Sequence, residues 1–270
     1  NQFYIQTWHG GIALKKIEKD AIDKLDKNYI NQAKEDSKDI DLLVSNGKFC
    51  TDMYKRAFWY DKEIIECGLP RNDILVNGDR QKIKKIVKDF FGIKDNENII
   101  LYAPTFRNEY INNPYDIDFN NVIKVLKQIT NEDWKVLIRL HPGQKNPEKY
   151  VKFSENIINA FKYKDIQELI LSSNILITDY SSTMFEAMIA NIIVVLYAND
   201  IDNYRNERGM YFEFEELPFK LTRNNKELLE VLSNIDFSKI QNNYKNFKDR
   251  IGLIENGNAS GKICDIIEKL

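Results

Sequence analysis

The chain has 270 residues, of which 43% are hydrophobic and 12% aromatic, so its composition excludes a disordered chain and suffices for one large domain or two modest ones. Its 39 Lys and Arg against 41 Asp and Glu give a formal net charge of -2, which provides no overall attraction to nucleic acid or anionic lipid. No apolar stretch reaches the length of a membrane span, and no signal peptide is visible.

Short apolar runs alternate with longer, charged, helix-like runs. The predicted strands, in chain order, are Tyr4–Thr7, Leu42–Ser45, Ile64–Cys67, Ile99–Tyr102, Val136–Leu140, Ile175–Thr178 and Ile192–Tyr197. The predicted helices are Asp20–Asp36, Lys48–Ala57, Arg80–Phe90, Phe119–Ile129, Thr183–Ala190, Asn225–Leu232 and Gly261–Leu270. Continuous Ile- and Val-rich strands are typical of parallel sheets covered on both faces, so the alternation predicts a parallel α/β architecture.

The polar, Lys-rich segment Val76–Asp95 is interpreted as a bridge between two α/β units. We therefore expect an N-terminal unit over 1–78, a linking helix over 79–94, a larger unit over 95–248 and a C-terminal helix over 249–270. The first unit is short for a Rossmann half and opens on Asn1 without an initiator methionine, so we expect a truncated unit that lacks an upstream portion.

The three cysteines, Cys50, Cys67 and Cys264, are far apart and lack metal-ligand spacing. They indicate free thiols in a reducing compartment.

Two histidines occur in the chain, each where an apolar run ends in a turn of small residues. His9 follows the run from Phe3, and His141 follows the run from Trp134. Ligands of an open α/β sheet bind beyond the carboxyl ends of its strands, so both imidazoles are expected at a binding crevice. Imidazole exchanges protons near neutral pH, and the pair favours acid–base chemistry over two structural histidines at strand ends.

The segment Ile175–Glu186 predicts a buried strand, a hydroxyl-rich turn and a helix that begins near Ser182. Free backbone N–H groups and the helix dipole favour a phosphate at such a helix start. The alternative is that Asp179, Ser181 and Ser182 only cap the helix. Glu186, about one helical turn further on, is a candidate for accepting hydrogen bonds from ribose hydroxyls, with a surface glutamate as the alternative.

Arginines follow two further strands. Arg107 comes after Ile99–Tyr102 at the same predicted sheet edge, and its planar fork of donors suits phosphate oxygens. The loop Tyr204–Gly209 adds Arg205 and Arg208, one of which has Glu207 as an alternative partner. Two distant histidines and dispersed Asp pairs do not support a metal site, and we expect none.

Six segments, in this order, resemble the CDP-glycerol glycerophosphotransferase family of teichoic acid and capsule synthesis. They are Gln6–Gly10, Tyr102–Arg107, Arg139–Pro142, Thr178–Ser182, Asn206–Phe212 and Asn256–Ser260. The resemblance runs over nearly the whole chain. One departure is Gly11-Ile12-Ala13, where members of the family commonly carry Thr-Pro after the first glycine, so the acceptor side is expected to differ.

The resemblance implies a GT-B-like α/β fold, with two Rossmann-type parallel-sheet units that face a cleft. The N-terminal unit is then the acceptor side, and the C-terminal unit binds the nucleotide donor. The implied reaction moves glycerol phosphate, or a related polyol phosphate, from CDP-glycerol to a hydroxyl of a polyol-phosphate or polysaccharide acceptor and releases CMP. No cofactor is implied. The lipid-linked acceptors of the family imply a cytoplasmic enzyme with peripheral contact at the inner face of the cell membrane.

On this basis His9 is expected to be the general base on the acceptor hydroxyl, and His141 to steady or protonate the departing CMP phosphate. The residues expected to bind substrate, Glu186 at the ribose among them, are Gly10, Arg107, Arg139, Asp179, Ser181, Ser182, Thr183, Glu186 and Arg208.

Two alternatives stay open. One is a GT-B glycosyltransferase that uses a UDP- or CMP-sugar, and the other is a non-catalytic nucleotide-binding subunit. The sequence leaves open glycerol against ribitol, primer addition against polymerisation, teichoic acid against capsule, and the oligomeric state.

Overall fold

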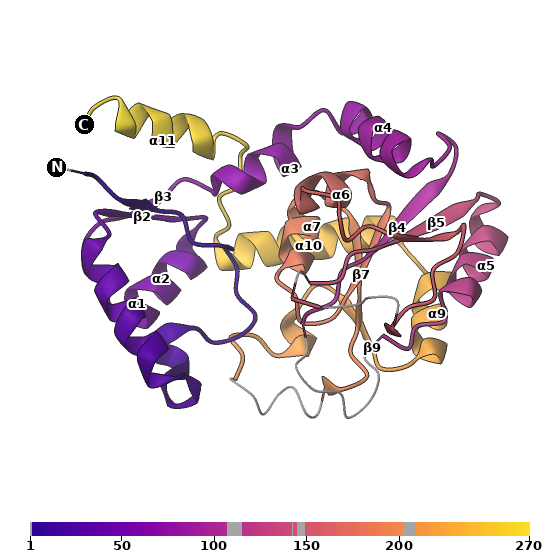
Figure 1. Cartoon of the computed structure of the whole chain (residues 1–270), viewed down its shortest axis with the longest axis horizontal. Coiled ribbons are helices and arrows are strands. Elements are labelled where there is room, and N and C mark those ends of the chain that lie inside the picture. The colour runs from indigo at the N-terminus through magenta and orange to yellow at the C-terminus, as the bar shows by residue number, and fades with distance from the viewer. Residues whose placement is uncertain (1, 107–114, 142, 145–148, 202–208) are drawn as a thin grey trace. The chain divides into compact units, whose positions relative to one another are not determined.

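The computed structural model describes residues 2–106, 115–141, 143–144, 149–201 and 209–270. The chain forms two compact units (Figure 1). Unit 1 combines Asn1–Asn77, Asp202–Leu217 and Lys245–Leu270, and unit 2 combines Gly78–Ile201 and Pro218–Tyr244.

Unit 2 is built on a parallel sheet that has six strands within the described residues. The strands are β4 (Asn98–Tyr102), β5 (Trp134–Ile138), β6 (Ile157–Asn159), β7 (Ile175–Thr178), β8 (Ile193–Tyr197) and β9 (Lys220–Thr222). Their spatial order is β6-β5-β4-β7-β8-β9, with every pair parallel. This is the doubly wound Rossmann order, whose strand order reverses between β4 and β7. Ligands of such sheets bind beyond the carboxyl ends of the strands at that reversal.

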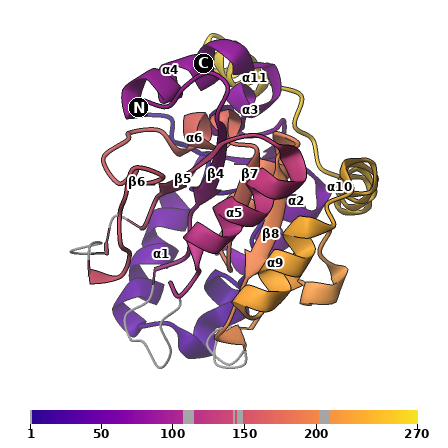
Figure 2. The same ribbon diagram turned by 90° about the vertical axis from the view of Figure 1, so that its right-hand side faces the viewer.

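Helices cover both faces of this sheet because successive side chains of a strand point to opposite faces, and the central strands are apolar on both. Ile100 and Tyr102 of β4 pack with α5 (Phe119–Thr130) and α9 (Asn225–Ser233) on one face (Figure 2). The other face carries α6 (Ile166–Ser172) and α7 (Thr183–Ile189), and α4 (Arg80–Phe91) packs on α6. The helix α10 (Phe237–Ile251) spans the residue boundary between the two units.

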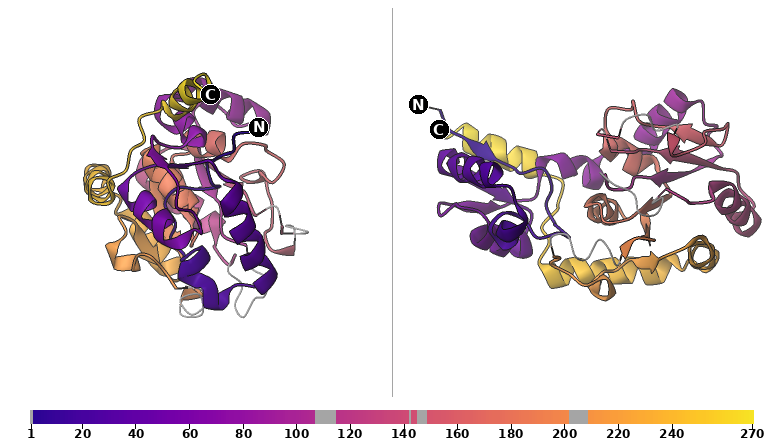
Figure 3. Two further views of the ribbon diagram at one scale, coloured as in Figure 1. Left: turned by 90° about the vertical axis from the view of Figure 1, so that its left-hand side faces the viewer. Right: turned by 60° about the horizontal axis from the view of Figure 1, so that its bottom comes forward.

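Unit 1 contains a parallel sheet of β1 (Ile5–Gln6), β2 (Leu42–Ser45) and β3 (Ile64–Glu66), in that order. The helices α1 (Lys27–Asp39) and α2 (Lys48–Ala57) lie on one face and α11 (Ala259–Ile267) on the other (Figures 1 and 3). The short helix α3 (Asp73–Asn77) anchors α11, because the Asp73 carboxylate accepts from the N–H groups of Ala259 and Ser260, both at 2.8 Å. Ile263 of α11 is buried with Val44, Cys67 and Leu69.

The seven predicted strands and seven predicted helices correspond to elements of the structure, with shifted ends. The helix predicted from Asp20 begins at Lys27, because the Asp26 side chain caps it by accepting from the N–H groups of Asn28 and Tyr29. Before that cap lies a 3-10 segment, Glu18–Lys24. The strand predicted from Val136 begins at Trp134 and ends at Ile138, so Arg139 and His141 lie in the loop after it.

The extents of the two units differ from the expected ranges. The segment expected as a linking helix belongs to unit 2, where Arg80 donates to the carbonyls of Leu171 and Ser173 at 3.1 and 3.2 Å. The segment expected as a separate C-terminal helix belongs to unit 1, because α11 buries Ile263 against its sheet.

Two further expectations concern the thiols and the membrane. Cys50 and Cys67 are buried, Cys264 is exposed, and all three are free thiols, as the sequence indicated. Among the described residues, no helix has both the length and the apolar character needed to cross a membrane.

Candidate active site

His9 stands in a tightly held turn just after β1. Trp8 adopts the left-handed conformation, with φ at 56°, and its N–H donates to Gln6 Oε1 at 2.9 Å. The Trp8 ring packs edge-on against Phe58, with centroids 4.8 Å apart, and against the His9 ring at 4.2 Å. A non-glycine residue in this conformation is uncommon and costs energy, so the surrounding contacts must hold the turn in place. The result is an exposed imidazole at the carboxyl end of β1.

The environment of His9 favours its neutral form. Desolvation by the surrounding protein, and secondarily the positive charge of Arg71, lower the pKa of His9 below its ordinary value. Arg71 also donates to the His9 carbonyl at 2.7 Å. A neutral imidazole near pH 7 is ready to accept a proton, which is what a general base requires.

We expect Arg71→Met to raise the pKa of His9 towards its ordinary value, because the neighbouring positive charge is removed. The rise is only partial, since desolvation is the larger cause and remains. Arg71→Lys keeps the charge and is expected to leave the pKa lowered. The two histidines give two imidazole Cε1–H signals, so an NMR titration measures the shift directly, with His9→Asn to assign the signal. An unchanged titration in Arg71→Met would contradict the electrostatic role of Arg71.

Beneath the His9 turn lies a polar cluster of Asn46, Asn72 and Glu255. Glu255 Oε1 accepts from Asn46 Nδ2 at 2.9 Å and from Asn72 Nδ2 at 2.7 Å, and Oε2 accepts from the Leu69 N–H at 3.3 Å. Burial raises the pKa of Glu255 although these three donors oppose the shift. A Cβ on Gly11 would lie 2.2 Å from Asn46 Nδ2, so a side chain at this position collides with the cluster. The cluster therefore explains why glycine follows the expected substrate-binding Gly10.

In unit 2, Asp179 joins the two strand ends at the reversal of strand order. Its Oδ1 accepts from the Thr105 N–H at 2.8 Å, from Thr105 Oγ1 at 2.6 Å and from the Tyr180 N–H. Thr105 follows β4 and Asp179 follows β7, and Asp179 is only 3% exposed. Asp179 thus fixes the edge at which ligands of this sheet type bind.

His141 lies in the loop after β5, beside the same edge. Its Nδ1 accepts from the Gly143 N–H at 3.0 Å, and its ring lies 5.4 Å from that of Phe106, the residue after Thr105. With Nδ1 occupied as an acceptor, the neutral imidazole carries its proton on Nε2. His141 is exposed, so Nε2–H can donate to a ligand oxygen.

The hydroxyl-rich turn of unit 2 bonds within itself. Thr183 Oγ1 and the Thr183 N–H approach Ser181 Oγ at 2.9 and 3.4 Å, whereas Ser182 makes no side-chain cap. Glu186 is only 7% exposed and accepts from Gln167 Nε2 at 3.3 Å. The surface reading of Glu186 is therefore wrong, and the hydrogen bond seen here ties it to α6.

The expected arginines have different outcomes. Arg139 donates through its guanidinium to the carbonyls of Phe161 and Ala160, so the structure shows it holding the loop after β6. Arg107 and Arg208 lie outside the described residues. Gly209, directly after Arg208, accepts from the Lys16 N–H at 3.1 Å and so joins unit 1, not the unit expected for this loop.

The structure thus gathers His141, Asp179 and the Ser181–Thr183 turn at one edge of unit 2, and His9 with Gly10 at one edge of unit 1. Sequence reasoning missed the residues that support them: Arg71, Asn46, Asn72, Thr105 and Glu255. Thr105 and Glu255 fall in or beside segments that carried the family resemblance, and that position is a usable signal. Arg71, Asn46 and Asn72 carry no such signal.

Comparison with known proteins covers the whole chain. Residues 1–269 match the family described as CDP-Glycerol:Poly(glycerophosphate) glycerophosphotransferase. The chain is 33% identical over 292 residues to the teichoic acid poly(glycerol phosphate) polymerase of Staphylococcus epidermidis, covering 100% of this chain and 39% of that protein. It is 31% identical over 281 residues to the enzyme of the same name from Bacillus subtilis, covering 98% of this chain and 37% of that protein. The chain therefore spans less than half the length of these relatives.

A solved structure of the wall teichoic acid polymerase TagF superposes with a TM-score of 0.85 and 32% identity, over 99% of this chain and 68% of that one. The superposition confirms the α/β, GT-B-like fold class that the resemblance implied. Together with the match over residues 1–269, these likenesses show that the chain belongs to the CDP-glycerol:poly(glycerophosphate) glycerophosphotransferase family.

Proposed function

We propose that this protein transfers glycerol phosphate from CDP-glycerol to a hydroxyl of a teichoic-acid or capsular acceptor and releases CMP. The observation that carries the proposal is the exposed imidazole of His9 at the end of β1, held by Trp8 and Arg71 in surroundings that lower its pKa. The names of the relatives support the substrate class, since they are poly(glycerol phosphate) polymerases. A TagF variant with asparagine in place of a histidine has also been solved after a soak with CDPG.

In the proposed reaction, the acceptor oxygen attacks the distal phosphorus of CDP-glycerol. The new P–O bond forms as the bond to the CMP phosphate breaks, and His9 takes the proton that the acceptor hydroxyl loses. His141 Nε2–H donates to the departing phosphate oxygen, which stabilises the negative charge that develops there. Phosphoryl transfer depends mainly on positioning and charge stabilisation, so the Ser181–Thr183 turn, Arg107 and Arg208 are proposed to hold the diphosphate.

The remaining assignments follow from the same proposal. Gly10 gives the acceptor close access to the backbone, and Asp179 shapes the donor edge through Thr105. The proposed roles of Glu186 at the ribose and of Arg139 at the substrate use the acceptor and donor positions that their bonds to Gln167 and to the Phe161 carbonyl leave. Lipid-linked acceptors of the family extend the proposal to peripheral contact with the inner face of the cell membrane.

The test is CMP release from CDP-glycerol in the presence of a glycerol-phosphate oligomer, with CDP-ribitol and UDP-glucose as comparators. Release from CDP-glycerol at least about tenfold faster than from either comparator supports the proposal. Faster release of CMP from CDP-ribitol would identify ribitol phosphate as the transferred group. Release of UDP from UDP-glucose would favour a glycosyltransferase. Binding of CDP-glycerol without any turnover would contradict the enzyme and favour a nucleotide-binding subunit.

A further inference from the structure

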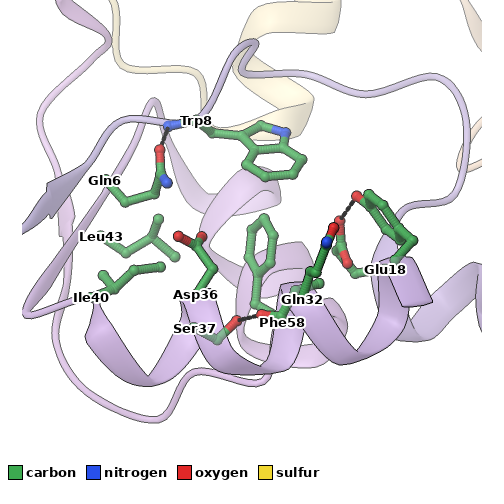
Figure 4. Close-up of a pocket in the computed structure, with 11 residues that line it drawn as sticks. Gln6, Trp8, Glu18, Gln32, Asp36, Ser37, Ile40, Leu43 and Phe58 are labelled. Atoms are coloured by element: carbon green, nitrogen blue, oxygen red, sulfur yellow. Dashed lines mark hydrogen bonds between the residues drawn. The ribbon is translucent and has the colours of Figure 1, made fainter. Parts of the chain in front are cut away.

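A pocket of about 240 Å³ lies directly beneath Trp8 in unit 1 (Figure 4). It lies between the end of β1 and the helix α1, and Leu43 of β2 also lines it. This volume accommodates a small organic unit.

The floor of the pocket is apolar. It is formed by Leu43, Ile40 and Phe58, which are themselves almost fully buried, and the Trp8 ring meets Phe58 edge-on above them. Such a surface suits the C–H face of a sugar or polyol, which apolar and aromatic side chains pack against.

The walls are polar and carry acidic groups. Asp36 directs its carboxylate into the pocket below Trp8, and Gln32 lies one turn away on α1 (Figure 4). Glu18 is 3% exposed and accepts from the Tyr29 hydroxyl at 2.5 Å. Carboxylate and amide oxygens accept hydrogen bonds from hydroxyl groups, and the amide of Gln32 can also donate.

The charge of the lining disfavours a phosphate group. Two carboxylates, Glu18 and Asp36, face the pocket, and none of the described residues that line it is Lys, Arg or His. Like charges repel, and burying a phosphate here without a cation would carry a large desolvation cost. The lining therefore selects a neutral, hydroxyl-bearing group.

Trp8 links this pocket to the proposed general base. Its indole lines the pocket, while its ring centroid lies 4.2 Å from that of the neighbouring His9. A molecule bound in the pocket would therefore lie next to Trp8, the residue whose ring packs on the His9 imidazole.

We propose that this pocket binds an uncharged sugar or polyol unit of the acceptor, next to the hydroxyl that reacts, and that Asp36 and Gln32 determine this specificity. The inference rests on the proposed function for the identity of the reaction, but its ligand chemistry follows from the pocket alone. It implies that the acceptor presents a neutral unit to unit 1, with its phosphates outside the pocket.

The binding test uses methyl β-N-acetylglucosaminide, glycerol and glycerol 3-phosphate as probes, with saturation-transfer NMR on the whole protein. The variants are Asp36→Ala and Gln32→Ala, and the matched control is Glu35→Ala, an adjacent carboxylate on α1 that pairs with Lys38 at the surface. We expect the neutral probes to bind, glycerol 3-phosphate to bind more weakly, and Asp36→Ala to weaken neutral binding on the order of tenfold, as loss of a charge-assisted hydrogen bond predicts. Glu35→Ala is expected to match wild type, because exposed ion pairs contribute little.

The kinetic test measures CMP release against acceptor and donor concentration in the same variants. We expect Asp36→Ala to raise the KM for the acceptor and to leave the KM for CDP-glycerol unchanged. Unaltered probe binding and unaltered acceptor KM in Asp36→Ala and Gln32→Ala would overturn the pocket assignment, as would stronger binding of glycerol 3-phosphate than of the neutral probes. If wild type releases no CMP but Asp36→Ala loses the neutral probes, the pocket assignment stands and the proposed function fails.

Discussion

His9→Ala is expected to lower turnover of CDP-glycerol by roughly 10²- to 10⁴-fold, the usual contribution of a general base, while the affinity for CDP-glycerol stays close to wild type. The physical reason is that the His9 imidazole is neutral, exposed and held in unit 1, whereas the expected donor-binding residues Asp179 and Ser181–Thr183 are in unit 2. Turnover is measured as CMP release, and donor affinity by isothermal titration calorimetry.

Three comparisons sharpen this prediction. Added imidazole should restore part of the activity of His9→Ala, because it replaces the missing base. His141→Ala, which removes the same type of side chain from the loop after β5, should weaken donor binding as well as turnover. Activity should persist at pH values below the usual pKa range of histidine, because the lowered pKa leaves His9 neutral there. It should be lost as the pH falls through the pKa of His9. Loss of donor binding in His9→Ala would reject its assignment to the acceptor.

Asp179→Ala is expected to lower the free energy of unfolding by about 3 kcal/mol, because it leaves the N–H groups of Thr105 and Tyr180 and the Thr105 hydroxyl without their shared acceptor. The same change should weaken CDP-glycerol binding, since the ends of β4 and β7 are no longer joined. Urea unfolding and calorimetry measure the two effects.

Asp179→Asn separates the structural role from direct contact with substrate. The donors of Thr105 and Tyr180 meet Oδ1, which asparagine retains, while the charge is lost and Oδ2 is replaced by an amide nitrogen, so the destabilisation should be smaller. We expect donor affinity to stay near wild type in Asp179→Asn. A loss as large as that in Asp179→Ala would show that the carboxylate itself binds the donor.

The central strands could be predicted because each is a continuous apolar run, and helix starts could be predicted where a polar cap precedes the run. The prediction failed where tertiary contacts override local pattern. The strand β5 begins with Trp134 and Lys135, and the charged Lys135 is tolerated in a buried strand because its ammonium lies 3.4 Å from Glu97 and bonds Asn156. The edge strands β6 and β9, and the polar helix α10, are too short or too polar to stand out.

The residue types of the candidate site could be predicted from the sequence, but the directions in which its side chains point could be predicted less well. His9, His141 and Asp179 could be predicted because each follows a predicted strand, and parallel sheets bind ligands beyond the carboxyl ends of their strands. Whether an arginine faces a ligand or a backbone carbonyl depends on tertiary contacts, which the spacing of residues in the sequence does not reveal. In this structure Arg139 donates to the carbonyl of Phe161. Glu255 and Asn46 are 209 residues apart, so their hydrogen bond is invisible to any local pattern.

The interleaving of the two units along the sequence also sets the order in which their residues are synthesised. Unit 1 draws on residues at both ends of the chain, whereas every residue of unit 2 is made before Lys245. Chains generally fold domain by domain as they leave the ribosome, and distant contacts form only after both partners exist. The contacts of Asn46, Asn72 and Leu69 with Glu255 therefore form only after all of unit 2 has been synthesised. A chain stalled on the ribosome before residue 255 therefore holds every residue of unit 2 but lacks the carboxylate that bonds Asn46 and Asn72.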